Sequence, residues 1–176
     1  MRIRSVLVYP FFLVIVLLGI ITVYSAYWYE PGHSPSVILD AQGGVTRLTI
    51  AEVMDRATVK PIGVRDVWND QTYTYGCVEL YDLLDVFGAL MPADETWRVT
   101  LVNVQGKEVS FTQDEVMQRN VLYLAVTLDD KILEPGFSQS PYAGGPMRMV
   151  IREREGTSYG PEYYLWCIYK IIVEGT

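Results

Sequence analysis

The chain has 176 residues, half of them hydrophobic, with 14 basic and 21 acidic side chains and a net charge of −7 at pH 7. This length fits one domain and an appendage. All 21 acidic residues but only 12 of the basic ones follow Trp28, and the basic residues of that part do not form a cluster in the sequence. We therefore expect no nucleic-acid partner, since such binding requires clustered positive charge.

The N-terminus carries an uncharged run of 23 residues, Val6 to Trp28. As a helix it would span roughly 34 Å, enough for a hydrocarbon core of about 30 Å. Arg2 and Arg4 precede the run, and the next basic residue is Arg47. Because positive residues favour the cytoplasmic side, residues 1–28 are predicted to form a single-pass anchor with a cytoplasmic N-terminus. The rest of the chain is then extracytoplasmic, at the cell membrane.

A cleaved signal peptide is the alternative interpretation of the same segment. Signal peptides have a shorter apolar region, of about 7–15 residues, followed by a small-x-small cleavage site. The run here is longer and ends in aromatic residues, although Val23-Tyr24-Ser25 is a tolerable cleavage site. Both interpretations export the domain.

Residues 29–44 are predicted to form a linker and a first extended segment. Glu30 to Ser36 is rich in proline, glycine and serine, and Val37 to Leu39 is a short strand closed by the turn at Gly43-Gly44. A helix follows at Thr49 and runs to about Arg56, because Thr49 and Glu52 have the spacing of a capping box.

The next elements alternate between strands and a short helix. Thr58 to Asp66 and Thr72 to Gly76 have strand character, with a turn at Asn69-Asp70 between them. Val78 to Phe87 places its leucines at helical spacing, and Gly88 follows as the predicted C-terminal cap.

The second half of the chain is richer in strands. A hairpin is predicted around Gln105-Gly106, and a second capping box at Thr112 and Glu115 opens a helix to about Gln118. The remaining predictions are a strand at Val121 to Leu128, a turn at Asp129-Asp130-Lys131 leading to Ile132-Leu133, a long loop from Glu134 to Pro146, and strands at Met147 to Arg152 and Tyr163 to Val173. Together these elements predict a mixed α+β sandwich with short helices.

The ordered set of elements resembles the sulfite-oxidase-like, molybdopterin-binding domain family. The match spans roughly residues 45 to 174, so the predicted domain covers 45–176. It rests on five segments in order. The first is the helix Leu48 to Ala57, a strand and then Gly76-Cys77-Val78-Glu79-Leu80-Tyr81-Asp82-Leu83-Leu84, similar to a helix, strand and Gly-Val-x-Leu-x-x-Leu-Leu opening. The others are the hairpin around Gln105-Gly106; Val121 to Leu133; Gly144-Gly145-Pro146-Met147-Arg148-Met149-Val150, similar to a Gly-x-Pro-Leu-Arg-Leu-Val strand; and Tyr164 to Val173.

Of the cations that meet the cofactor phosphate in the family, the resemblance leaves Arg148, and the expected ligand site also includes Gly145 of the same motif. We expect Arg65, on a neighbouring loop, to add a second cation and Tyr142 to contribute from the long loop. The alternative for Arg148 is a strand arginine that pairs with a nearby glutamate. In catalytic members of the family a cysteine thiolate holds molybdenum, but the corresponding region here, Val59 to Trp68, contains no cysteine. Cys77 lies at a later apolar position of the opening motif, where we expect a small buried side chain.

We therefore expect a membrane-anchored, non-catalytic binding or docking module with a molybdopterin-binding-type fold. Its partner is a membrane or surface protein, or a small-molecule ligand of unknown identity. The long loop is expected to shape one wall, with Phe137 and Tyr142 as contacts, because loops of this length are often functional. Two alternatives stay open: a molybdenum-cofactor-dependent oxidoreductase, and a structural subunit of a membrane complex.

Other chemistry is poorly supported by the sequence. Its single histidine, His33, lies in the linker, and its two cysteines, Cys77 and Cys167, are far apart in the chain, so the spacing of a zinc site is missing. Whether the cysteines pair stays open, because sequence does not reveal proximity. We expect Asp82 and Asp85 to be solvated on the polar face of their helix.

Overall fold

The computed structural model describes residues 35–65, 71–92, 95–136, 140, 142–152 and 164–175. These residues form a strand-rich α+β fold with short helices, as predicted. The helices are α2 (Ile50–Arg56), α3 (Leu80–Val86) and α4 (Gln113–Met117). The strands are β1 (Ser36–Ala41), β2 (Gly44–Thr49), β3 (Val59–Arg65), β4 (Thr72–Glu79), β5 (Trp97–Asn103), β6 (Glu108–Thr112), β7 (Leu122–Leu128), β8 (Lys131–Ile132), β9 (Glu134–Pro135), β10 (Ala143–Gly145), β11 (Arg148–Ile151) and β12 (Ile168–Gly175).

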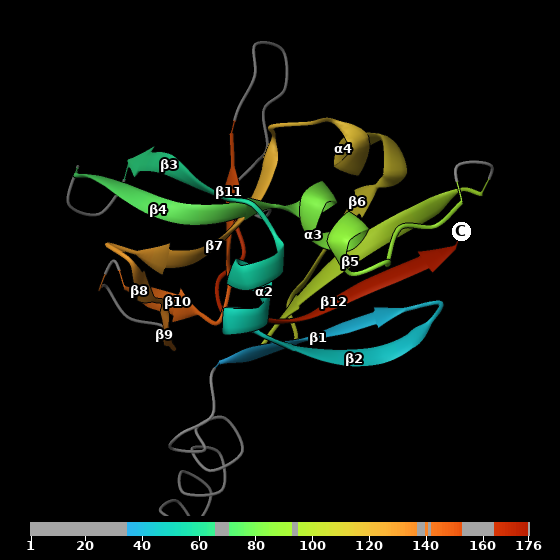
Figure 1. Ribbon diagram of the computed structural model, residues 1–176, viewed down its shortest axis with the longest axis horizontal. Coiled ribbons are helices and arrows are strands. Elements are labelled where there is room, and N and C mark those ends of the chain that lie inside the picture. The colour runs from blue at the N-terminus through green and yellow to red at the C-terminus, as the bar shows by residue number, and fades with distance from the viewer. Residues whose placement is uncertain are drawn as a thin grey trace, which may run out of the picture. The chain divides into compact units, whose positions relative to one another are not determined.

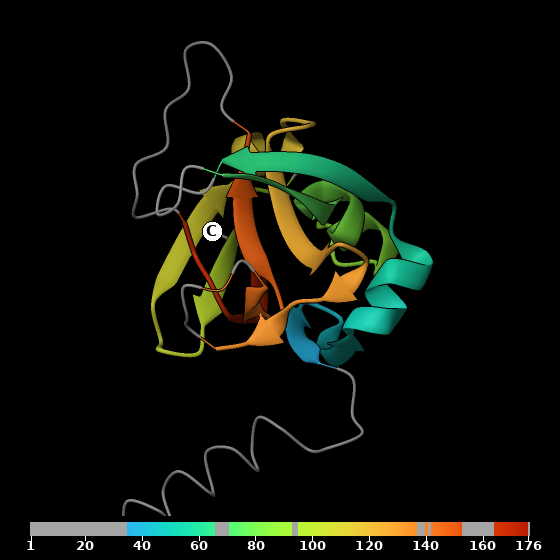
Figure 2. The ribbon, with the colours of Figure 1, turned by 90° about the vertical axis from the view of Figure 1, so that its left-hand side faces the viewer.

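The strands form two five-stranded sheets and one small pair. The first sheet has the order β2-β1-β12-β5-β6, in which β1 and β12 run parallel. The second sheet has the order β11-β7-β4-β3, with β8 also paired to β7. Figure 1 shows α2 and α3 between the β3–β4 pair and the β1–β2 pair, and in Figure 2 β7 and β11 run side by side.

Both predicted capping boxes are confirmed. Thr49 and Glu52 exchange side-chain and backbone hydrogen bonds at the start of α2, and Thr112 and Glu115 do the same at α4. Each pair satisfies two backbone donors that the first helical turn leaves without a partner. The predicted cap at Gly88 is also confirmed, since its φ of 66° is a left-handed conformation that glycine adopts without steric cost.

The main core lies between the two sheets and the helices. It includes Val99 and Leu101 of the first sheet, Leu122 and Leu124 of the second, and the leucines of α3, all buried. A second, smaller core covers the opposite face of the second sheet. Its buried members are Tyr75, Cys77, Tyr123, Ala125, Leu128, Leu133 and Val150. Strand β7 is buried throughout, which explains its nearly continuous apolar sequence.

Several element boundaries differ from the sequence predictions. Strand β2 was not predicted, and β4 continues through Glu79, so α3 begins two residues later than expected. The predicted loop from Glu134 to Pro146 contains the parallel pair β9–β10. The last strand begins at Ile168 instead of Tyr163, because Cys167 has a φ of 57° and interrupts the extended backbone.

The predicted membrane anchor, Val6 to Trp28, lies outside the described residues, as does the turn at Asn69-Asp70. Within the part of the chain that the structure describes, no helix has the length and apolar character needed to cross a bilayer. The anchor therefore stays a prediction from the sequence.

Candidate functional site

The residues singled out by sequence gather largely on the outer face of the second sheet, the face that carries the smaller core. Strand register places Lys60, Cys77, Ala125 and Arg148 in one row across β3, β4, β7 and β11. Directly paired residues of antiparallel strands point to the same face. The row therefore brings a thiol and two cations to one side of the sheet.

Arg148 is held firmly at one end of this row. It is only 9% exposed, and its guanidinium donates a hydrogen bond of 3.0 Å to the Tyr75 hydroxyl. Its central carbon lies 3.9 Å from the ring centroid of Trp166 and 5.2 Å from that of Tyr75. Such cation–π contacts strengthen when the cation is withdrawn from water. We call Tyr75, Cys77, Arg148 and Trp166 the arginine cluster.

The thiols of this region are buried and protonated. Cys77 is fully buried, and this desolvation raises the pKa of its thiol to about 12, although the charge of Arg148 acts in the opposite direction. Burial also raises the pKa of Cys167, against a hydrogen bond from its thiol to the Gly136 carbonyl oxygen. Both cysteines are free thiols in the structure. The expectation that Cys77 is a small buried side chain is confirmed.

Two further predicted site residues lie close to this cluster: Gly145 is the last residue of β10, and Tyr142 directly precedes that strand. The Tyr142 hydroxyl donates to an Asp129 carboxylate oxygen at 2.8 Å, and its ring packs against the smaller core. Gly145 is in close contact with backbone, since a Cβ there would lie 2.3 Å from the Leu133 carbonyl oxygen. Phe137, the other expected loop contact, lies outside the described residues.

The structure separates Arg65 from the other predicted site residues. Arg65 is the last residue of β3 and pairs with Thr72, five positions along the strand from Lys60. Because side chains alternate along a strand, Arg65 also points to the opposite face from Lys60 and the arginine cluster. Its side chain therefore does not join Arg148 in one site.

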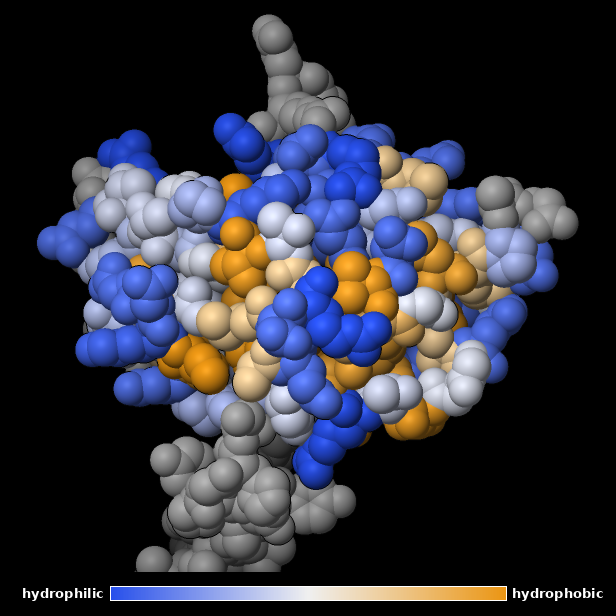
Figure 3. All heavy atoms as spheres, in the orientation of Figure 1, coloured by the Kyte–Doolittle hydropathy of each residue, from blue (hydrophilic) through white to orange (hydrophobic). Residues whose placement is uncertain are grey.

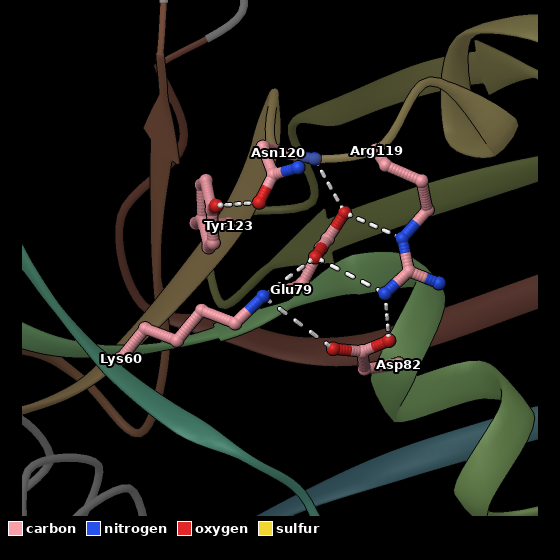
Figure 4. Close-up of polar contacts among 6 residues, drawn as sticks. All are labelled: Lys60, Glu79, Asp82, Arg119, Asn120 and Tyr123. Atoms are coloured by element: carbon pink, nitrogen blue, oxygen red, sulfur yellow. Dashed lines mark hydrogen bonds and ion pairs between the residues drawn. The ribbon is translucent and has the colours of Figure 1, made fainter.

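A second polar cluster, which the sequence analysis did not identify, centres on Glu79 (Figure 4). The Glu79 side chain is 2% exposed, and Lys60 and Arg119 both form ion pairs with it, at 3.1 Å and 3.0 Å. The backbone N–H of Asn120 donates to the same carboxylate at 2.5 Å. Lys60, Glu79, Asp82, Arg119 and Asn120 are called the glutamate cluster below.

Asp82 belongs to the glutamate cluster through Arg119 and Lys60. The prediction that Asp82 is simply solvated is therefore wrong, whereas Asp85 is exposed as expected. The physical reason is the two cations, which reach α3 from β3 and from the connection after α4. The sequence signal for the cluster was a single charged residue, Glu79, between apolar Val78 and Leu80 at a strand–helix junction.

Opposing effects act on the ionisation of Glu79. Burial raises the pKa of its carboxyl, but the Asn120 hydrogen bond and the charges of Lys60 and Arg119 outweigh burial, so the pKa is lowered overall. Glu79 is thus ionised. The two negative side chains of the cluster, Glu79 and Asp82, are matched in charge by the two positive ones, Lys60 and Arg119. This arrangement joins β3, β4, α3 and the connection between α4 and β7, and it is structural in character.

The arginine cluster is the better candidate for ligand recognition. It combines a fixed cation, two aromatic rings and a nearby loop, which is the composition of sites that bind planar or anionic groups. Among the described residues, no group of three or more histidine, cysteine and acidic side chains is arranged to hold a metal ion. Comparison with protein-family models gives no match for this chain, and comparison with curated proteins gives none.

Proposed function

We propose that this chain is a membrane-anchored binding or docking module, built on the sulfite-oxidase-like scaffold and carrying out no molybdenum chemistry. The observation that carries the proposal is Arg148, a cation fixed between aromatic rings in the strand that resembles the Gly-x-Pro-Leu-Arg motif of the family. The loop that contains Tyr142 adjoins it. The proposed location is the outer side of the cell membrane.

The order of elements supports the scaffold part of this proposal. The helix α2, the strands β3 and β4, the helix α3 and the hairpin β5–β6 follow one another as in the motifs on which the resemblance rests. Strands β7, β11 and β12 then occupy the positions of the three later motifs. The family assignment is part of this proposal.

The residues present do not fit a molybdopterin-bound metal of the family type. In the family the metal is held by a cysteine of the segment that corresponds to Val59 to Trp68, and this segment contains no cysteine. Cys77 lies elsewhere and is fully buried, and its thiol donates a hydrogen bond to the Tyr75 carbonyl oxygen at 3.7 Å.

Elemental analysis tests the non-catalytic part of the proposal. The full chain is produced in a host that makes the cofactor, purified in detergent, and assayed for molybdenum and pterin fluorescence beside a catalytic family member. We expect neither signal. Molybdenum and pterin at one equivalent each would refute the proposal in favour of the oxidoreductase alternative, and Cys77→Ser would then identify the ligand.

The binding part needs a test of its own. A panel of anionic and aromatic small molecules is screened for thermal stabilisation of the full chain. A ligand of the arginine cluster should stabilise the wild type and lose this effect in Arg148→Gln. Arg98→Gln is the matched control, because Arg98 forms a surface ion pair with Glu174 on the first sheet. The site would be contradicted if both variants lost the ligand's stabilising effect equally, or if the ligand stabilised Arg148→Gln as much as the wild type.

A further inference from the structure

Strand β2 is the end strand of the first sheet and is unusually open. It pairs with β1 on one side, and no other described strand pairs with it. Its first four residues, Gly44 to Arg47, are exposed on both faces. Val45 is 69% exposed, the highest value among the large hydrophobic residues that the structure describes.

Other sheet ends carry features that discourage pairing with another chain. The edge strand β3 of the second sheet contains Pro61, which has no backbone N–H to donate. The opposite end of the first sheet, β6, begins with the charged Glu108 and leads directly into α4. Natural proteins protect sheet edges in such ways because a free edge is a template for strand addition. Strand β2 has neither a proline nor a register shift, and its one charged residue is Arg47.

We propose that β2 pairs antiparallel with β2 of a second copy of this chain, with the two-fold axis at Thr46. This register places Thr46 opposite Thr46, Val45 opposite Arg47 and Gly44 opposite Leu48. It avoids opposing two arginines, and threonine pairs across antiparallel strands are favourable. The two first sheets become one continuous sheet, and the contact is closed because both copies use the same surface.

Charge complementarity supports a second copy as the occupant. Asp40 lies on the neighbouring strand β1 and pairs with Val45 of β2. Because Val45 would in turn lie opposite Arg47 of the other copy, Asp40 is two strands away from that arginine. Two strand spacings amount to about 10 Å, within the combined reach of the two side chains across the Val45 methyl groups. The two-fold axis repeats this Arg47–Asp40 pair. The Asp40 carboxylate also pairs with Lys170 of its own chain at 2.8 Å, which orients it on this face.

A cysteine on the two-fold axis provides the most direct test. Directly opposed residues in an antiparallel pair have Cα atoms about 4.5–5.5 Å apart, which suits a disulfide. The full chain with Thr46→Cys, in detergent under mild oxidation, should form a covalent dimer. Ser110→Cys, on exposed β6 at the opposite end of the same sheet, is the matched control and should stay monomeric. The two native thiols are buried and do not compete.

Charge reversal tests the register without a crosslink. In sedimentation experiments, Arg47→Glu and Asp40→Lys should each weaken the wild-type dimer at least about tenfold, because each homodimer then opposes like charges. An equimolar mixture of the two variants should recover the dimer, since both cross-pairs are again of opposite charge. Lys107→Glu, in the exposed β5–β6 turn, should have no effect.

Three results would overturn the proposal, which does not depend on the proposed ligand site. The first is a wild-type chain that is monomeric at every concentration. The second is a dimer unaffected by either charge reversal, which would place the contact elsewhere, including in the membrane anchor. The third is a mixture of the two variants that fails to recover dimerisation although each variant melts like the wild type.

Discussion

Replacing Glu79 by glutamine removes one charge from the glutamate cluster and leaves its shape nearly unchanged. Removing one partner of a buried ion pair costs about 3–5 kcal/mol, because the other charges lose their compensation. The side chains of Lys60 and Arg119 are 33% and 45% exposed, so water recovers part of this loss. We therefore expect Glu79→Gln to lower the free energy of unfolding by about 2–3 kcal/mol.

Urea unfolding of the full chain in detergent, followed by tryptophan fluorescence, measures this change. With a urea dependence of about 1–3 kcal/mol per molar, the unfolding midpoint should fall by about 0.7–3 M. Glu174→Gln is the matched control, because its ion pair with Arg98 has both side chains about half exposed. Such surface pairs contribute about 0–1 kcal/mol. Equal effects of the two variants would refute the reasoning.

The comparison of the wild type with Glu79→Gln should also depend on pH. The pKa of Glu79 is lower in the folded state, so its contribution is fully present above the unfolded value of about 4.5. The contribution is lost as pH falls through the lower folded pKa. The stability difference between the wild type and Glu79→Gln should therefore be constant near neutral pH and shrink under acid. A difference that grows below pH 4.5 would contradict the assignment.

Three further predictions concern backbone packing, thiol reactivity and helix caps. Gly145→Ala should destabilise the fold by about 2–3 kcal/mol in the same urea assay, because the new Cβ meets the Leu133 carbonyl oxygen, while Gly43→Ala, with open space around it, should cost little. Neither native cysteine should react rapidly with an aromatic disulfide reagent at pH 8, whereas both should react in denaturant; a fast native reaction would contradict their burial. Thr49→Ala and Thr112→Ala should each lower stability by about 1 kcal/mol, and an unchanged urea midpoint would argue against the capping boxes.

Local patterns in the sequence were enough to predict many of the elements. The two Thr-x-x-Glu caps, the leucine spacing of α3 followed by Gly88, and the unbroken apolar run of β7 depend on neighbours within a few residues. The uncharged N-terminal run is equally local, which is why a membrane anchor can be predicted from it. Strand β2 was missed because the capping box after it dominated the pattern around Leu48.

The candidate site depended on contacts between distant segments. Arg148 meets Tyr75 across 73 residues of sequence, and Arg119 and Lys60 converge on Glu79 from opposite sides in the chain. Strand register determines these pairings, and register depends on the packing of whole sheets against their cores. A shift of one residue would turn each side chain to the other face. The sequence therefore determined which segments form helices and strands locally. Only the tertiary structure decided which charged side chains of distant segments pair with one another.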